Sequence, residues 1–330
     1  MWHNSFGSKF KIEIWGASHT PEIGVRIGGV PSGISLCEED FMSDILRRKA
    51  GGKGTTTRIE SDIPTIVSGV CDGITTGEPI EITFANSNVR SSDYSQFENH
   101  NRPSHVDFTA RAKYGPEVDL RGSGQFSGRM TLLLVAAGVV AKKVVESIGY
   151  TTTIVEIGGS RNSEEFDDII EKARLDGDSV GGVIECRANG VKVGLGEPFF
   201  DSAESIISHL MFSVPAVKGV EFGSGFEGVR LRGSERNDCF VDDEGHTATN
   251  NEGGINGGIT NGNELVVRVA IKPTPSISCE QMTYNKELGE VAPLRIKGRH
   301  DACIVLRAGV VVESVVAIAL AELKLTIDNG

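Results

Sequence analysis

The sequence TLLLVAAGVVAKKVVESIG at residues 131–149 contains the longest apolar run of the chain, Leu132–Ala141. On a helix these side chains would be apolar on nearly all sides, which is typical of a helix buried in a protein core. Gly149 is a typical helix stop. We therefore predict a buried helix over residues 131–148. Its apolar run is too short for the ~20 residues that cross a membrane.

Shorter periodic segments flank this helix on both sides. Alternation and turn residues predict strands at residues 11–15, 25–29, 66–70, 80–84, 151–157 and 265–271, and a hairpin formed by 183–186 and 191–193. Helical spacing predicts helices at residues 35–49, 164–175, 201–212 and 308–323, and Ser35 with Glu38 has the spacing of a capping box. Residues 85–124 are predicted to form a long irregular loop, and such loops are usually functional or disordered. No linker or repeat divides the chain, so we expect one domain over residues 1–330 in the α/β (α+β) class.

The composition disfavours several classes of function. The chain has 330 residues, of which 39% are hydrophobic, and its net charge is −12 at pH 7. Nucleic acids and anionic membranes bind basic surfaces, so neither is an expected partner.

The first ten residues lack the apolar segment of a signal peptide, which favours a cytoplasmic protein. Six cysteines without a CxxC pair indicate buried free thiols and no metal site.

One segment is strongly basic, although the net charge of the whole chain is negative. Arg47, Arg48, Lys49, Lys53 and Arg58 lie close together with no acidic residue among them. A solvated basic loop is one interpretation. The other is a lid that clamps an anion, because the guanidinium group offers a planar fork for carboxylate and phosphate.

Polar residues that could carry chemistry gather before the buried helix. The sequence is NRPSHVD at residues 101–107 and RGSGQFSGR at 121–129, which continues directly into the helix. A glycine-rich loop at a helix N-terminus can present N–H groups to phosphate, although a simple turn is an equal alternative. His19 and His105 could give or take a proton near neutral pH, but a lone histidine is more often structural.

Three further segments are unusual for a simple core. Residues 250–262 (NNEGGINGGITNG) hold five glycines, so no regular strand or helix is expected there, and such backbone can lie against a flat ligand. Residues 272–276 (KPTPS) predict a rigid turn after a strand. Arg299, His300 and Asp301 place a cation, a titratable ring and a carboxylate side by side.

Together these segments resemble the chorismate synthase family over nearly the whole chain. The resemblance rests on eight ordered blocks: GASH at 16–19, RPSHVD at 102–107, YG at 114–115 with DLRGSGQFSGR at 119–129, VAAGVVAKK at 135–143, PAVKGVEFGSGF at 215–226, NNEGGINGGITNG at 250–262, KPTPS at 272–276 and GRHDAC at 298–303. It implies a β-α-β sandwich with helices packed between two antiparallel sheets, assembled as a homotetramer. The implied reaction is the anti-1,4-elimination of phosphate from 5-enolpyruvylshikimate 3-phosphate, which gives chorismate and depends on reduced FMN, with NADPH as a candidate reductant.

The resemblance also implies roles for individual residues. His19 would protonate the departing phosphate, His105 would protonate the reduced flavin near N1, and Asp301 would assist at flavin N5. Ser18 and Ser127 would support that relay. Substrate would be bound by Arg48, Arg58, Arg102, Arg121 and Arg129, with Arg48 also near NADPH. FMN would be bound by Gln125, Phe126, Ser127, Pro215, Ala216, Gly257, Lys272, Pro273, Thr274, Pro275, Ser276 and Arg299.

The chain departs from the family pattern at several of these positions. Ala17 and Thr20 replace a glutamate and a glycine, Gln125-Phe126 replaces Arg-Ser, and Ala302 replaces a proline. No proposed acid or base is lost. Two rival functions remain open: an NADPH-dependent flavin reductase that uses the same pocket, for which no Rossmann fingerprint is present, and an inactive anion-binding or assembly protein.

Overall fold

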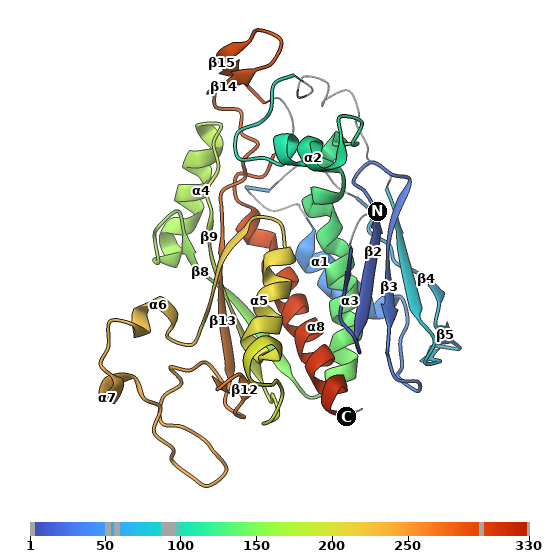
Figure 1. Ribbon diagram of the computed structural model, residues 1–330, viewed down its shortest axis with the longest axis vertical. Coiled ribbons are helices and arrows are strands. Elements are labelled where there is room, and N and C mark those ends of the chain that lie inside the picture. Colours follow the sequence, from blue (N-terminus) through green and yellow to red (C-terminus); the bar gives the residue numbers. More distant parts are fainter. Residues whose placement is uncertain are drawn as a thin grey trace.

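Two antiparallel sheets enclose a layer of helices in the computed structural model, which describes residues 4–49, 54–55, 60–86, 97, 99–296 and 300–328 (Figure 1). The first sheet has the order β1 (Ser5–Phe6), β2 (Lys11–Gly16), β3 (Glu22–Gly28), β7 (Ile80–Ala85) and β4 (Thr65–Ser68). The second has the order β10 (Val217–Phe222), β13 (Leu265–Ile271), β9 (Gly182–Asn189) and β8 (Gly149–Ile157).

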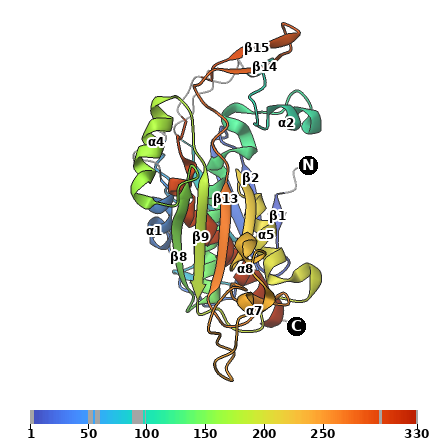
Figure 2. The same ribbon diagram turned by 90° about the vertical axis from the view of Figure 1, so that its left-hand side faces the viewer.

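Helices α3 (Thr131–Val145) and α8 (Gly309–Asp328) lie between the two sheets, with α1 (Glu39–Arg48) and α5 (Ala203–Ser213) beside them (Figure 1). Helix α4 (Phe166–Leu175) lies along the edge of the second sheet, as Figure 2 shows from the side. The smaller elements are α2 (Asp107–Tyr114), α6 (Gly225–Gly228), α7 (Gly233–Arg236), β5 (Val70–Cys71), β6 (Ile74–Thr75), β11 (Ile255–Asn256), β12 (Ile259–Thr260), β14 (Gln281–Asn285) and β15 (Glu290–Leu294). The predicted β-α-β sandwich is confirmed.

The position of α3 follows from its sequence. Its residues from Thr131 through Ala141 are all buried, because a helix that is apolar on every side must be covered on every side. Buried side chains from Phe10 to Leu325 form one continuous apolar cluster. The two sheets and the helices between them therefore share this apolar core.

Several local predictions were wrong. Helix α1 begins at Glu39, with no capping box at Ser35, which instead forms a β-bridge with Ile74. The expected hairpin does not form, because β9 continues to Asn189 and pairs with β8 and β13. Helix α2 lies within the stretch predicted to be irregular.

The hairpin of β14 and β15 and the strand β10 were not foreseen. All six cysteines are free, but only Cys186 and Cys303 are buried, so the expected burial is wrong for the other four. In the described part of the chain, no helix is both long and apolar enough to cross a membrane.

Helices α3 and α8 pack closely against each other at a glycine. A Cβ atom on Gly138 would lie 2.3 Å from the Cβ of Ser314 and 2.7 Å from its Cα. These atoms belong to two packed helices, so no flexible side chain can move aside. Gly138 therefore sets the distance between the two central helices.

We expect Gly138→Ala to lower the free energy of unfolding by about 1–3 kcal/mol, as overpacking of a core typically does. The loss should outweigh the higher helix propensity of alanine. Urea unfolding would measure it. Adding Ser314→Gly, which removes the opposing Cβ, should restore part of the lost stability. An unchanged unfolding midpoint for Gly138→Ala would contradict this packing argument.

Candidate active site

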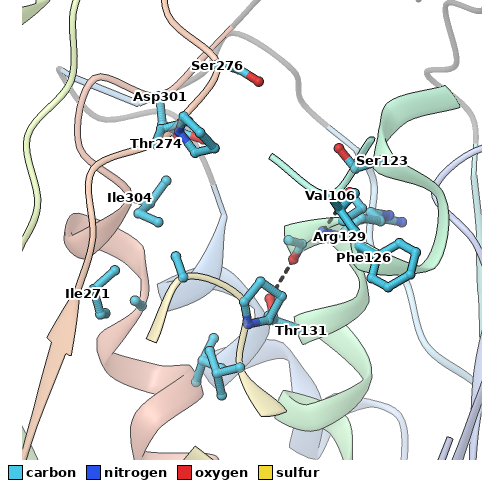
Figure 3. Close-up of a pocket in the computed structure, with 18 of the residues that line it drawn as sticks. Val106, Ser123, Phe126, Arg129, Thr131, Ile271, Thr274, Ser276, Asp301 and Ile304 are labelled. Carbon is cyan, nitrogen blue, oxygen red and sulfur yellow. Dashed lines mark hydrogen bonds between the residues drawn. The ribbon is translucent and has the colours of Figure 1, made fainter. Parts of the chain in front are cut away.

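A cavity of about 740 Å³ lies where the N-terminal ends of α3 and α8 meet the last residues of β13 and the C-terminal end of α5. Figure 3 shows Asp301, Thr274 and Ile304 on one side of it and Ser123, Phe126 and Arg129 on the other. Seven basic side chains line it among the described residues: Arg48, Lys49, Arg102, Arg129, Lys218, Lys272 and Arg307. The acidic lining residues are Glu60, Asp62 and Asp301, and the histidines are His19, His105 and His300.

This excess of cations lies in a chain whose net charge is −12. The local reversal of charge suits small molecules that carry several negative charges, because opposite charges attract most strongly where water is excluded.

The glycine-rich loop before α3 forms one wall of the cavity. Ser127 caps the first turn, since its hydroxyl oxygen accepts from the backbone N–H of Arg129 at 3.2 Å. The hydroxyl of Thr131 donates to the carbonyl oxygen of Gly128 at 2.7 Å, the dashed line in Figure 3. The helix N-terminus therefore faces the cavity, which favours an anion there.

Two of the predicted substrate arginines share one buried carboxylate. Arg129 forms a close ion pair with Asp62, and Nη1 of Arg48 lies 3.6 Å from Oδ2 of the same side chain. Arg48 also donates through Nε to Thr131 Oγ1 at 3.0 Å and through Nη2 to the Gly128 carbonyl at 3.0 Å. Burial lowers the pKa of Arg48 to about 9, so the side chain still carries its charge at neutral pH. Arg48 thus lies in the cavity wall rather than on a solvated loop.

His105 is held by a chain of polar contacts. Its Nδ1 lies 3.1 Å from Asp107 Oδ1, and Arg102 donates to both carboxylate oxygens of Asp107 at 2.6 and 2.8 Å. Ser123 Oγ lies 3.1 Å from Nε2 on the opposite side of the ring. Burial lowers the pKa of His105 below 6.5, the hydrogen bond to Asp107 raises it, and Arg102 lowers it.

His19 follows β2 in a turn that Thr20 holds in place. The Thr20 hydroxyl accepts from the Ala17 backbone N–H at 2.9 Å and lies within hydrogen-bond distance of the carbonyl oxygens of Ala17 and Glu22. The threonine that departs from the family pattern therefore supports the turn that presents His19. Likewise Ala302, which replaces a proline, donates its backbone N–H to the Gly54 carbonyl at 3.0 Å, a bond that proline could not make.

The cavity brings together most of the predicted site residues. Those that line it are His19, His105, Asp301, Ser127, Arg48, Arg102, Arg129, Gln125, Phe126, Pro215, Ala216, Lys272, Thr274, Pro275 and Ser276. Ser18 is buried directly behind Gly122, and Pro273 lies between two lining residues. Arg58 and Arg299 lie outside the described residues.

Two predicted contacts are not part of the cavity lining. Arg121 is half exposed and pairs with Asp119 at 2.7 and 2.9 Å. Gly257 lies in the turn between β11 and β12, and the next residue, Gly258, accepts from the backbone N–H of Ala203 at the N-terminal end of α5, whereas the C-terminal end of α5 lines the cavity. The five-glycine stretch therefore forms a small hairpin and not a wall of this pocket.

Sequence reasoning identified Asp301 but missed two other carboxylates of the site, Asp62 and Asp107. Asp107 is part of the RPSHVD block, but nothing in that block indicated that it pairs with both Arg102 and His105. Asp62 was not foreseen at all, because its partner Arg129 is 67 residues away.

The residues of the cavity fit a flavin. Phe126, Pro215 and Ile304 provide apolar surface for a flat ring, and the basic side chains provide partners for a phosphate. Thr274 Oγ1 and His300 Nε2 are buried without a hydrogen-bond partner among the described residues. Buried polar atoms of this kind indicate a missing polar ligand, because an unsatisfied group costs about 1–3 kcal/mol.

We expect Asp107→Asn to lower kcat by about 10-fold to 10²-fold, less than loss of the imidazole itself. Asp107 raises the pKa of His105, so its removal should lower that pKa further and leave less imidazolium at a given pH. The loss should therefore be larger at pH 8 than at pH 6, and a pH profile of kcat would show it. A loss that does not change with pH would contradict the assignment of His105 as an acid.

Comparisons with known proteins agree with this geometry. The family model of chorismate synthase matches residues 10–325. A chorismate synthase of Chitinophaga pinensis is 53% identical over 323 residues, which cover 98% of this chain and 96% of that protein. One of Korarchaeum cryptofilum is 42% identical over 346 residues, which cover 96% of each. A crystal structure of chorismate synthase matches with a TM-score of 0.76 and 29% identity, covering 98% of this chain and 94% of the other.

The fold, the cavity and these comparisons together define an enzyme of the lyase class, with a basic cavity lined by three histidines in a β-α-β sandwich. The chain belongs to the chorismate synthase family, whose members are lyases that work with a flavin.

Proposed function

We propose that this chain eliminates phosphate from 5-enolpyruvylshikimate 3-phosphate to give chorismate, with reduced FMN in the same cavity. In the net reaction the C3–O bond breaks with its electron pair, and the C6 hydrogen leaves as a proton, for which Asp301 is the proposed route. The electron pair of the C6–H bond then forms the new double bond that completes the conjugated diene. The observation that carries the proposal is that His19, His105 and Asp301 line the same cavity, together with seven basic residues of the described part of the chain.

The basic residues would hold two anionic molecules face to face. Substrate carries one phosphate and two carboxylates, for which Arg48, Arg129 and Arg102 are the proposed partners, with Arg48 also near NADPH if that is the reductant. Each is already paired with Asp62 or Asp107, so substrate would add to an existing network of charges. Arg58 and Arg121 stay proposed contacts of the substrate.

FMN would be held by the loop before α3, by the start of β10 and by the turn after β13. The proposed contacts are Gln125, Phe126, Ser127, Pro215, Ala216, Lys272, Pro273, Thr274, Pro275, Ser276 and Arg299, with Gly257 as a further candidate. The chemistry that reduced FMN supplies when bound is transient donation of electron density while phosphate leaves.

The acids and bases of this chain have distinct proposed tasks. His19 would donate a proton to an oxygen of the departing phosphate, and His105 would hold a proton near N1 of the flavin. Asp301 would assist proton movement near N5, with Ser18 and Ser127 in support. Arg307 donates to Asp301 Oδ2 at 2.7 Å, which fixes the carboxylate at the cavity wall.

The test is an anaerobic assay of phosphate release with substrate and dithionite-reduced FMN. Release of one phosphate for each chorismate is expected, and no release would reject the proposal. Running the same assay in air with only NADPH and FMN separates two forms of the enzyme. Activity there would show that the chain reduces its own flavin, whereas we expect the form that needs an external reductant.

We also propose that the chain is a cytoplasmic homotetramer. Phe199 and Phe200 are 85% and 90% exposed on the surface, and such side chains are often covered by another subunit. Sedimentation of the purified protein would test the assembly, and a monomer would reject it.

A further inference from the structure

The loop Gly122–Ser123–Gly124 joins the two histidines of the cavity. On one side, a Cβ atom on Gly122 would lie 2.3 Å from His19 Cε1, so this glycine packs directly against the first imidazole. On the other side, Ser123 Oγ lies 3.1 Å from Nε2 of His105. One three-residue loop thus contacts both proposed acids.

Ser123 holds an unusual backbone conformation for a residue with a side chain. Its φ is +69°, between values of +57° at Gly122 and +55° at Gly124. A left-handed backbone favours glycine, because a Cβ atom crowds the neighbouring carbonyl. The chain nevertheless has a serine at the middle position, and its backbone N–H donates to the Leu120 carbonyl at 2.9 Å. A residue kept at a locally unfavourable position indicates a task for its side chain.

Each ring nitrogen of His105 has its own hydrogen-bond partner. Asp107 accepts from Nδ1, and its side chain is almost fully buried, so the proton on Nδ1 is fixed. Nε2 is therefore the nitrogen that gains or loses a proton, and Ser123 is its partner. A hydroxyl can donate to the bare nitrogen or accept from the protonated one. Serine can thus satisfy His105 in both of its protonation states.

We propose that Ser123 is a positioning residue that holds the His105 ring and supports its protonated form. The inference rests on the proposed function, in which His105 supplies a proton inside the cavity.

The charged groups that face His105 come from three segments. Arg102 and Asp107 flank it on its own segment, Lys272 follows β13, and His300 precedes the N-terminal end of α8. Arg102 and Lys272 disfavour the imidazolium, while Asp107 favours it. Ser123 adds an uncharged hydrogen-bond acceptor to this set.

The first test uses the protein without ligand. Titration of ¹⁵N-labelled His105 by NMR should show a lower pKa in Ser123→Ala than in the parent chain, because the imidazolium loses an acceptor and hydrogen bonds to charged groups are the stronger ones. The Nε2 resonance of the neutral ring should also move towards that of a nitrogen without a hydrogen bond. An unchanged pKa together with an unchanged Nε2 resonance would overturn the proposal.

A glycine variant separates this role from local strain. Ser123→Gly removes the hydroxyl but also relieves the backbone strain at this left-handed position, so Tm should rise. The kcat should fall by about tenfold, which is less than the loss expected when an acid itself is removed. KM should change much less than kcat. Ser147→Gly is the matched control, because Ser147 also has a positive φ, +66°, but lies exposed in the turn after α3. It should raise Tm and leave kcat unchanged.

The outcomes distinguish this proposal from the proposed function. If the parent chain releases no phosphate, the function fails, but the NMR comparison still decides whether Ser123 supports His105. If phosphate is released and Ser123→Gly keeps full kcat, the positioning role fails and the function stands.

Discussion

Replacement of His105 by alanine should lower kcat by about 10²-fold to 10⁴-fold, as loss of a positioned acid or base typically does. The imidazole lines the cavity, its Nδ1 is fixed by Asp107, and Nε2 faces Ser123, so the ring is held with one nitrogen available for proton transfer. Anaerobic turnover with pre-reduced FMN measures the loss.

The matched control is His246→Ala. His246 also pairs with an aspartate, at 2.7 Å, but it lies exposed on a surface loop. That variant should keep the parental kcat. If His105→Ala turned over at the parental rate, His105 would have no part in the reaction.

His19→Ala should lower kcat by a similar ~10²-fold to 10⁴-fold, and the loss should grow as the pH rises. A phosphate monoester takes up a proton near pH 6. Below that pH the leaving group already carries a proton and needs His19 less. At pH 8 it leaves as the dianion unless an acid assists it, and the negative charge of the bound dianion favours the protonated form of His19 that supplies this proton.

The pH dependence of the ratio between parent and variant is the decisive measurement for His19. A ratio that increases from pH 6 to pH 8 supports its role as the acid for the leaving phosphate. A ratio that is constant or that decreases would assign His19 to binding alone. Urea unfolding of the variant checks that the turn held by Thr20 remains intact.

The secondary structure could be predicted best where local periodicity was strong. The strand over Leu265–Ile271 was predicted with its exact bounds, and the buried helix ended only three residues earlier than expected. The helix at 35–49 was predicted to start too early. The hairpin at 183–193 failed because β9 pairs with two distant strands, and no local pattern specifies such partners.

The site was predicted less completely than the fold. Motifs identified the histidines and most of the cavity lining, because catalytic residue types occur in short blocks. They did not show that Arg102 is neutralised by Asp107, or that Arg121 pairs with Asp119 outside the cavity. The partner of an arginine depends on which carboxylate packs beside it, and that is a property of the folded chain.

By itself the sequence determined the class of the fold, the buried central helices and the family, since each depends on residue types and spacings along the chain. Only the tertiary structure decided which side chains meet: Asp62 with Arg129 across 67 residues and Ser123 with His105 across 18. It also placed Gly257 outside the cavity lining, beside the start of α5. The physical reason is that hydrogen bonds and ion pairs act over a few ångströms, so they form only after packing has brought distant segments together.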